Sequence, residues 1–180
     1  MSFNLNPLVA VIVALVASER LVELRISERH RRLLLTEGGV EVGAQHYPLI
    51  VALHAAWLGA IIIRAPVYES ISWFPLGLFV CLQPIRIWIL LSLGKYWTTR
   101  VITVPNAPLI KRGPYRYFSH PNYILVAAEI ALLPLAFGEE GVALIFSVLN
   151  AVLMIMRLSV ETPALSARED LFEKTPHRHP

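Results

Sequence analysis

Residues 111–123 read KRGPYRYFSHPNY and lie between two strongly apolar segments of the chain. This stretch holds three basic residues and three tyrosines, and it has no acidic residue. Pro114 and Pro121 disfavour helix at the residues before them, so we expect a loop that ends where a helix begins near Asn122. Such a loop suits a ligand with an anionic or π-rich part. From composition alone, a loop whose cations only set membrane topology is the more frequent interpretation.

The overall composition is typical of a membrane protein. The chain has 180 residues, of which 56% are hydrophobic and 16% are charged, and its mean hydropathy is +0.57. Soluble domains carry about 25% charged residues. The net charge of +3 comes without a dense Lys/Arg run, which argues against a nucleic-acid partner. The single cysteine, Cys81, excludes an intrachain disulfide and a cysteine-rich metal site, and we expect no bound metal.

The apolar segments predict an all-α integral membrane protein with five transmembrane helices, a cytoplasmic loop over residues 95–121 and a C-terminal tail. The expected helices cover residues 5–22, 47–64, 73–93, 122–137 and 142–160. The first should continue into the charged residues that follow it as an amphipathic, mostly solvated segment ended by Gly38-Gly39. We expect one domain over residues 1–180, with a flexible tail at 166–180.

The distribution of Lys and Arg predicts the orientation in the membrane. Basic residues gather in the connections at 19–46 and 95–121 and in the tail, whereas residues 65–72 and 138–141 contain none. Positively charged connections stay in the cytoplasm. With five spans, the N-terminus would lie outside, and both basic connections and the tail would lie in the cytoplasm.

Four polar residues, His54, Arg86, Glu129 and Asn150, fall inside the expected spans. Ionisable groups there cost roughly 2–3 kcal/mol or more, so they should face the bundle interior and pair. We expect Arg86 to pair with Glu129, either as a structural ion pair or as part of a substrate site, and Glu129 is an alternative general base. His54 is more often a satisfied core histidine than a functional group, and Asn150 should bond to a neighbouring helix.

Arg157 and Glu161 stand four residues apart at the end of the last expected span, so they share one helix face. Leu165 continues that face. Without further information, a surface ion pair is the slightly favoured interpretation.

These motifs together resemble the isoprenylcysteine carboxyl methyltransferase family, whose members are integral-membrane enzymes that use S-adenosylmethionine. The resemblance is carried by GPY at 113–115, HPNY at 120–123 and the R-x-x-x-E-x-x-x-L pattern at 157–165. It covers residues 95–165, which would form the cofactor-binding and catalytic part. Two positions depart from the family pattern: Ser119 replaces an Arg, and Thr162 replaces a second Glu.

The resemblance implies S-adenosylmethionine as the methyl donor and S-adenosylhomocysteine as the product. Arg157 would face the methyl acceptor as a catalytic and substrate-binding residue, with Arg86 and His54 as further substrate-binding candidates and Glu129 or His54 as a base. The cofactor would be held by nine residues: Pro108, Leu109, Ile110, Tyr115, His120, Pro121, Asn122, Tyr123 and Glu161.

The expected function is O-methylation of a lipophilic acceptor at the membrane, either an isoprenylcysteine-type carboxylate or a lipid-like phenol or pyrone. The latter follows from residues 41–48 and 94–100, which look like a bacterial branch and imply a bacterial inner membrane. The expected partners are this acceptor and membrane lipids. Alternatives are a phospholipid amine N-methyltransferase, a membrane reductase with a nicotinamide cofactor, and a non-catalytic lipid-binding or assembly protein.

Overall fold

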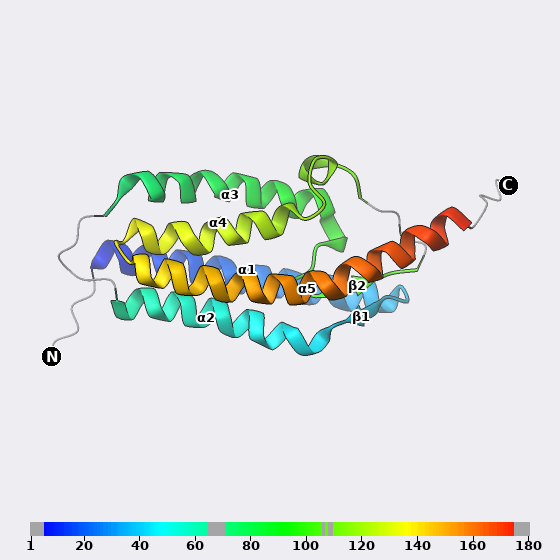
Figure 1. Cartoon of the computed structure of the whole chain (residues 1–180). Helices are drawn as coiled ribbons and strands as arrows, with labels where there is room; N and C mark the ends of the chain where they lie inside the picture. The colour runs from blue at the N-terminus through cyan, green and yellow to red at the C-terminus, as the bar shows by residue number, and fades with distance from the viewer. Residues whose placement is uncertain (1–5, 65–70, 106, 108–109, 175–180) are drawn as a thin grey trace.

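Five helices run side by side in the computed structural model and form an elongated bundle (Figure 1). The structure describes residues 6–64, 71–105, 107 and 110–174, with backbone alone at 164–174. The helices are α1 (Pro7–Thr36), α2 (Tyr47–Arg64), α3 (Trp73–Leu93), α4 (Pro121–Ala136) and α5 (Glu140–Lys174). Short 3-10 turns are η1 (Ala44–His46), η2 (Gly94–Tyr96) and η3 (Gly113–Arg116), and the strands are β1 (Val40–Val42) and β2 (Val101–Thr103).

The helix boundaries follow from local sequence signals. The Asn6 side chain accepts a hydrogen bond from the Leu8 amide at 3.0 Å, and Pro7 occupies the first turn of α1. Proline fits there because its missing amide would have no intrahelical partner. Pro121 likewise opens α4, close to the predicted start at Asn122.

The apolar helices identify a membrane protein. Among the described residues, the segments Ala44–Arg64, Trp73–Tyr96 and Glu140–Pro163 are long and apolar enough to cross a bilayer, and Pro121–Ala136 is a shorter apolar helix. Large side chains such as Phe74 on α3 are exposed, as expected for a surface that faces lipid. Helix α1 carries several charges, so the number of five spans stays a prediction.

Two features differ from the sequence-based expectation. Helix α5 passes through Pro163 and continues to Lys174, although an end near residue 160 was expected. The flexibility expected for residues 166–180 stays a prediction. Residues 175–180 lie outside the described part. In addition, β1 and β2 pair antiparallel, with Val40 opposite Thr103 and Val42 opposite Val101. Strands of three residues give no alternating pattern in the sequence, and tertiary contact holds them together.

The apolar core lies between the helices, at the end of the bundle away from the sheet. Trp57 of α2 is 1% exposed and packs with buried residues of α1, α3 and α4. Its indole N–H donates a hydrogen bond to the carbonyl of Ile130 at 3.2 Å, which joins α2 to α4. This contact satisfies a polar group that would be costly to leave unpaired in an apolar interior.

The connections that follow α1 and α3 meet at one end of the bundle. Figure 1 shows the end of α1, the two strands, η3 and the last turns of α5 together, opposite the start of α1. The connections at 37–46 and 94–120 therefore lie at the same end of the bundle, next to the charged last turns of α1. Which side of the membrane this is stays a prediction.

Gly113, which begins η3, has φ +59°, and a Cβ there would collide with Ser92 and lie 3.2 Å from the Trp88 ring nitrogen. We therefore expect Gly113→Ala to lower the free energy of unfolding by about 1–3 kcal/mol, because left-handed backbone alone costs about 1–2 kcal/mol. Gly77→Ala is the matched control, since nothing lies within 4 Å of its added Cβ in α3. Unfolding midpoints in one detergent test this, and equal midpoints for the two variants would contradict it.

Candidate functional site

A cavity of about 510 Å³ lies between α1, α2, α4 and α5 and is bounded at one end by residues 97–99. This volume lies within the range of small-molecule sites. Most of its wall is apolar, from Ala17 and Leu21 of α1, along Ile50 to Ile62 of α2, to Leu153 of α5. Its polar residues are Arg20, Glu23, Tyr47, His54, Arg86, Thr98, Thr99, Asn122, Tyr123, Asn150 and Arg157.

The two motifs at 120–123 and 157–161 meet beside this cavity. The Tyr123 hydroxyl donates a hydrogen bond to the Glu161 carboxylate, whose oxygens lie 3.7 Å from Arg157 Nε and 3.9 Å from His120 Nδ1. The His120 ring stacks on Tyr123 with centroids 5.3 Å apart and planes 8° apart. The Arg157 guanidinium lies 5.3 Å from the same Tyr123 ring. The structure thus brings together residues that the sequence separates by a whole helical hairpin.

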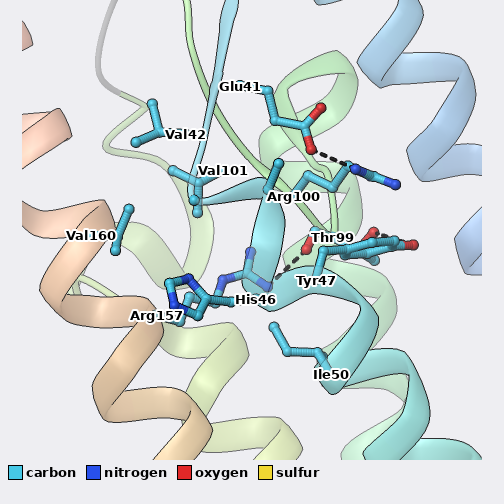
Figure 2. Close-up of a pocket in the computed structure, with 12 residues that line it drawn as sticks. Glu41, Val42, His46, Tyr47, Ile50, Thr99, Arg100, Val101, Arg157 and Val160 are labelled. Atoms are coloured by element: carbon cyan, nitrogen blue, oxygen red, sulfur yellow. Dashed lines mark hydrogen bonds and ion pairs between the residues drawn. The ribbon is translucent and has the colours of Figure 1, made fainter.

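Arg157 stands between two hollows. Its Nη1 donates to the Thr99 carbonyl at 2.8 Å, whereas its Nε is buried without a hydrogen-bond partner. Arg157, Tyr47, Ile50 and Thr99 line both the large cavity and a second, much smaller pocket. Figure 2 shows this smaller pocket, with Arg157 reaching toward Thr99. The guanidinium is therefore held at a fixed place by the Thr99 carbonyl, and its Nε faces the Glu161 carboxylate at ion-pair distance.

The smaller pocket is framed by the β1–β2 sheet. Glu41 of β1 accepts hydrogen bonds from Arg31 at 2.8 Å and from Arg100 at 2.5 Å, and Arg100 lies 3.8 Å from the centre of the Tyr47 ring. Burial opposes the charged form of Glu41, but the two arginine bonds prevail and hold its pKa below the usual value. Gly43, which also lines the pocket, packs closely against α5, because an added Cβ would lie only 2.9 Å from Val160.

A buried ion cluster joins α1, α3 and α4. Arg86, which is 3% exposed, forms two hydrogen bonds to Glu129 and one, at 2.7 Å, to Glu23. Arg20 pairs with Glu129 at 2.9 Å and with Glu23 at 2.8 Å, and Gln83 donates to Glu129 at 3.2 Å. The predicted Arg86–Glu129 pair is confirmed. The prediction of a mostly solvated charged face on α1 is wrong for Arg20 and Glu23, because α1 turns them toward Arg86.

Glu129 and Arg86 differ in their access to the cavity. Glu129 is 2% exposed, and its two oxygens accept four hydrogen bonds, which is about the capacity of a carboxylate. It does not line the large cavity, whereas Arg86, Arg20 and Glu23 do. This arrangement favours the structural interpretation of Glu129 over a role as a base.

The remaining candidates lie at or near the cavity. His54 lines it, and its Nδ1 lies 2.8 Å from the Ile50 carbonyl. Asn122 also lines it, with a buried side-chain oxygen that has no hydrogen-bond partner. Asn150 bonds to Met154 within α5 at 3.5 Å instead of to a neighbouring helix as expected.

The structure describes only some of the cofactor-binding residues that were expected at and before the start of α4. Tyr115 packs against the cluster of Ile89, Trp97 and Leu125, and burial, followed by the charge of Glu161, raises the pKa of its phenol. Ile110 is half-buried and Pro121 is buried at the start of α4. Two further predicted residues, Pro108 and Leu109, lie outside the described residues. Among the residues that the structure describes, no group of three or more His, Cys, Asp or Glu could hold a metal ion.

Sequence reasoning missed five polar residues of the cavity: Arg20, Glu23, Tyr47, Thr98 and Thr99. Arg20 and Glu23 follow directly on an apolar run, which could have indicated that they face the interior. Charged residues at such positions turn inward when an oppositely charged group lies there. Thr99 acts through its backbone carbonyl, which no side-chain pattern reveals.

Comparisons with known proteins agree with the motifs. The model of the isoprenylcysteine carboxyl methyltransferase (ICMT) family matches residues 75–167. The protein YpbQ of Bacillus subtilis, described as uncharacterised, is 33% identical over 160 residues, which cover 86% of this chain and 95% of YpbQ. An uncharacterised protein of Haemophilus influenzae is 25% identical over 158 residues, covering 85% of this chain and 92% of that protein. No solved structure matches at comparable significance.

The ion cluster predicts a large stability effect. Glu129→Gln removes a charge that two arginines share, so we expect the free energy of unfolding to fall by about 3–5 kcal/mol. Glu28→Gln is the matched control, because it breaks an exposed pair with Arg32 on α1 and should cost less than about 1 kcal/mol. Denaturant unfolding in detergent measures both. Similar losses for the two variants would show that the cluster contributes little.

Proposed function

The chain belongs to the isoprenylcysteine carboxyl methyltransferase family, and from this premise we propose that it is a membrane O-methyltransferase that uses S-adenosylmethionine. One observation carries the proposal. A largely apolar cavity ends against Arg157, and the Glu161 carboxylate lies within 3.7 Å of the same arginine. A lipophilic acceptor and a polar, cationic donor would therefore meet at one side chain.

The residues around Glu161 fit S-adenosylmethionine. A carboxylate suits the ammonium of the cofactor's amino-acid part, and the faces of Tyr123 and His120 suit a sulfonium cation or an adenine. Asn122 has a buried oxygen without a partner, which a donor on the cofactor would satisfy. In this proposal, Pro121 shapes the same wall, and Tyr115, Ile110, Leu109 and Pro108 contact the adenosine. When bound, the cofactor supplies a methyl group activated by positive sulfur.

Arg157 is the residue that we assign to the acceptor. Its guanidinium is held by the Thr99 carbonyl through Nη1 and lines the large cavity, so it can pair with an acceptor carboxylate or stabilise a phenolate. The same charge would repel an amine acceptor, which disfavours phospholipid N-methylation. Holding the acceptor oxygen in line with the methyl carbon in a water-poor cavity supplies most of the catalysis that such a transfer requires.

The acceptor would enter from the bilayer between α1 and α2. Two residues that line the cavity, Leu21 of α1 and Ala55 of α2, are also exposed on the surface of the protein, with Leu21 56% exposed. In a membrane protein, this surface faces hydrocarbon. A long-chain carboxylate, phenol or pyrone would reach Arg157 without crossing water. The cofactor would come from the cytoplasm. Both relatives are bacterial proteins, so the proposed location is the bacterial cytoplasmic (inner) membrane.

The first test is calorimetric titration of S-adenosylhomocysteine into the detergent-purified protein. We expect micromolar binding that Glu161→Ala weakens at least tenfold, because the ammonium loses its carboxylate partner. Glu28→Ala, which removes an equal charge from the surface of α1, should bind like the wild type. If the folded wild type does not bind, the methyltransferase proposal fails and a non-catalytic lipid-binding protein becomes the favoured alternative.

Lateral entry predicts a separate effect on acceptor kinetics. Ala55→Trp would narrow the opening, so we expect a severalfold increase in KM for a long-chain alkylphenol with unchanged affinity for S-adenosylhomocysteine. Ile63→Trp is the control on the same helix, because Ile63 is exposed but does not line the cavity. Equal KM values for the two variants would place the entrance elsewhere.

A further inference from the structure

His54 has a position in the cavity that the proposed reaction does not yet use. It lies on α2 four residues beyond Ile50, so its Cα is about 6 Å deeper along the helix axis. Ile50 and Arg157 line both hollows, and His54 lines the large cavity together with Arg157. An acceptor head group that lies between Arg157 and the imidazole can therefore present its hydroxyl to both side chains.

The hydrogen bond of His54 determines which ring nitrogen carries the proton. Its Nδ1 lies 2.8 Å from the Ile50 carbonyl oxygen, which can only accept, so Nδ1 must donate. In the neutral ring, Nε2 then bears a lone pair. The indole of the buried Trp57 contacts the ring edge-on, with centroids 6.4 Å apart and planes at 81°. Among the described residues, none forms a hydrogen bond with Nε2.

The other ionisable groups on the cavity wall are unsuited to accept a proton. Glu23 accepts hydrogen bonds from Arg20 and Arg86 on its two oxygens. The guanidinium groups of these arginines and of Arg157 have no acceptor atom. Tyr47 and Tyr123 are phenols, which in neutral form are poor bases. Glu129 lies outside the cavity wall with all of its lone pairs engaged.

We propose that His54 Nε2 is the proton acceptor for a hydroxyl-bearing, lipophilic methyl acceptor. This inference rests on the proposed methyltransferase function and narrows its substrate class to phenols or enols, because a carboxylate has no proton to lose at neutral pH. The hydroxyl proton passes to Nε2 as an oxygen lone pair forms the bond to the methyl carbon. The methyl–sulfur bond breaks, and its electron pair stays on sulfur. The imidazolium then releases its proton to water.

His46 is the obvious competitor, and its position distinguishes it. It lies beside Arg157 in the smaller pocket of about 20 Å³ and does not line the large cavity (Figure 2). That pocket has room for about one water molecule, so an aromatic head group does not fit. His46→Leu is therefore the matched control for His54→Leu, since both variants replace an imidazole with an apolar side chain of similar size.

The kinetic experiment compares two phenolic acceptors with equal alkyl chains. With an ordinary alkylphenol, we expect His54→Leu to lower kcat by about 10²–10⁴-fold with little change in KM, the usual contribution of a general base. An alkyl nitrophenol is already ionised at the assay pH. With this acceptor, the kcat of His54→Leu should be within severalfold of the wild-type kcat. His46→Leu should resemble the wild type with both. His54→Gln, which presents an amide near the Nε2 position, should not restore the ordinary phenol reaction.

A second readout needs no cofactor. The same nitrophenol, titrated spectrophotometrically while bound to the protein, should ionise at lower pH with the wild type than with His54→Leu, because Nε2 takes its proton. His46→Leu should match the wild type. The charged groups around the site, Arg20 and Glu23 of α1, Arg86 of α3, Glu129 of α4 and Arg157 of α5, are the same in all three proteins.

Specific outcomes would overturn the inference. Full activity of His54→Leu on the alkylphenol, an equal loss on both phenols, or identical titrations of the bound probe would each exclude His54 as the proton acceptor. Methylation confined to a long-chain carboxylate would do the same while leaving the methyltransferase function intact. If the wild type methylates no acceptor, the proposed function fails instead, and the probe titration still decides whether Nε2 takes a proton.

Discussion

The pairing of Arg86 with Glu129 and Glu23 is the interaction on which the arrangement of α1, α3 and α4 depends. Charges placed among apolar helices must find partners inside the bundle, because hydrocarbon offers none. Arg86 binds carboxylates from two different helices, and Arg20 closes the cluster by contacting both of those carboxylates. These contacts set the rotation of α1 about its axis. The same rotation places Arg20 and Glu23 on the cavity wall.

A second constraint places Arg157 at the other end of the cavity. Its partner is the carbonyl of Thr99, which belongs to the connection between α3 and α4. That connection is held to α1 by a hydrogen bond between the hydroxyl groups of Ser27 and Thr99, and to β1 by the pairing of Arg100 with Glu41. The small sheet and the charged end of α1 thus hold the Arg157 guanidinium in place through Thr99. Residues far from the proposed chemistry determine where that chemistry would occur.

Under the proposed function, different parts of the site bind the methyl donor, the acceptor oxygen and the acceptor chain. Glu161 and the ring of Tyr123 serve the donor, Arg157 serves the oxygen of the acceptor, and the apolar wall toward Ile62 serves its chain. His54 lines the same cavity as Arg157, and a phenolic head group between the two would present its hydroxyl to both. The carboxylates of the ion cluster are bound by Arg20 and Arg86, so under this proposal the imidazole is the group that accepts the proton.

The sequence by itself determined the membrane class, the positions of the apolar helices and the family motifs, and it made Arg86 and Glu129 the expected ion pair. Each follows from local hydropathy, from proline at helix starts, or from the high cost of an unpaired charge in lipid. Only the tertiary structure decided that Arg20 and Glu23 join that pair, that β1 meets β2, and that Thr99 holds Arg157. Those contacts depend on helix rotation and on backbone atoms brought together from distant segments, and no short stretch of sequence encodes either.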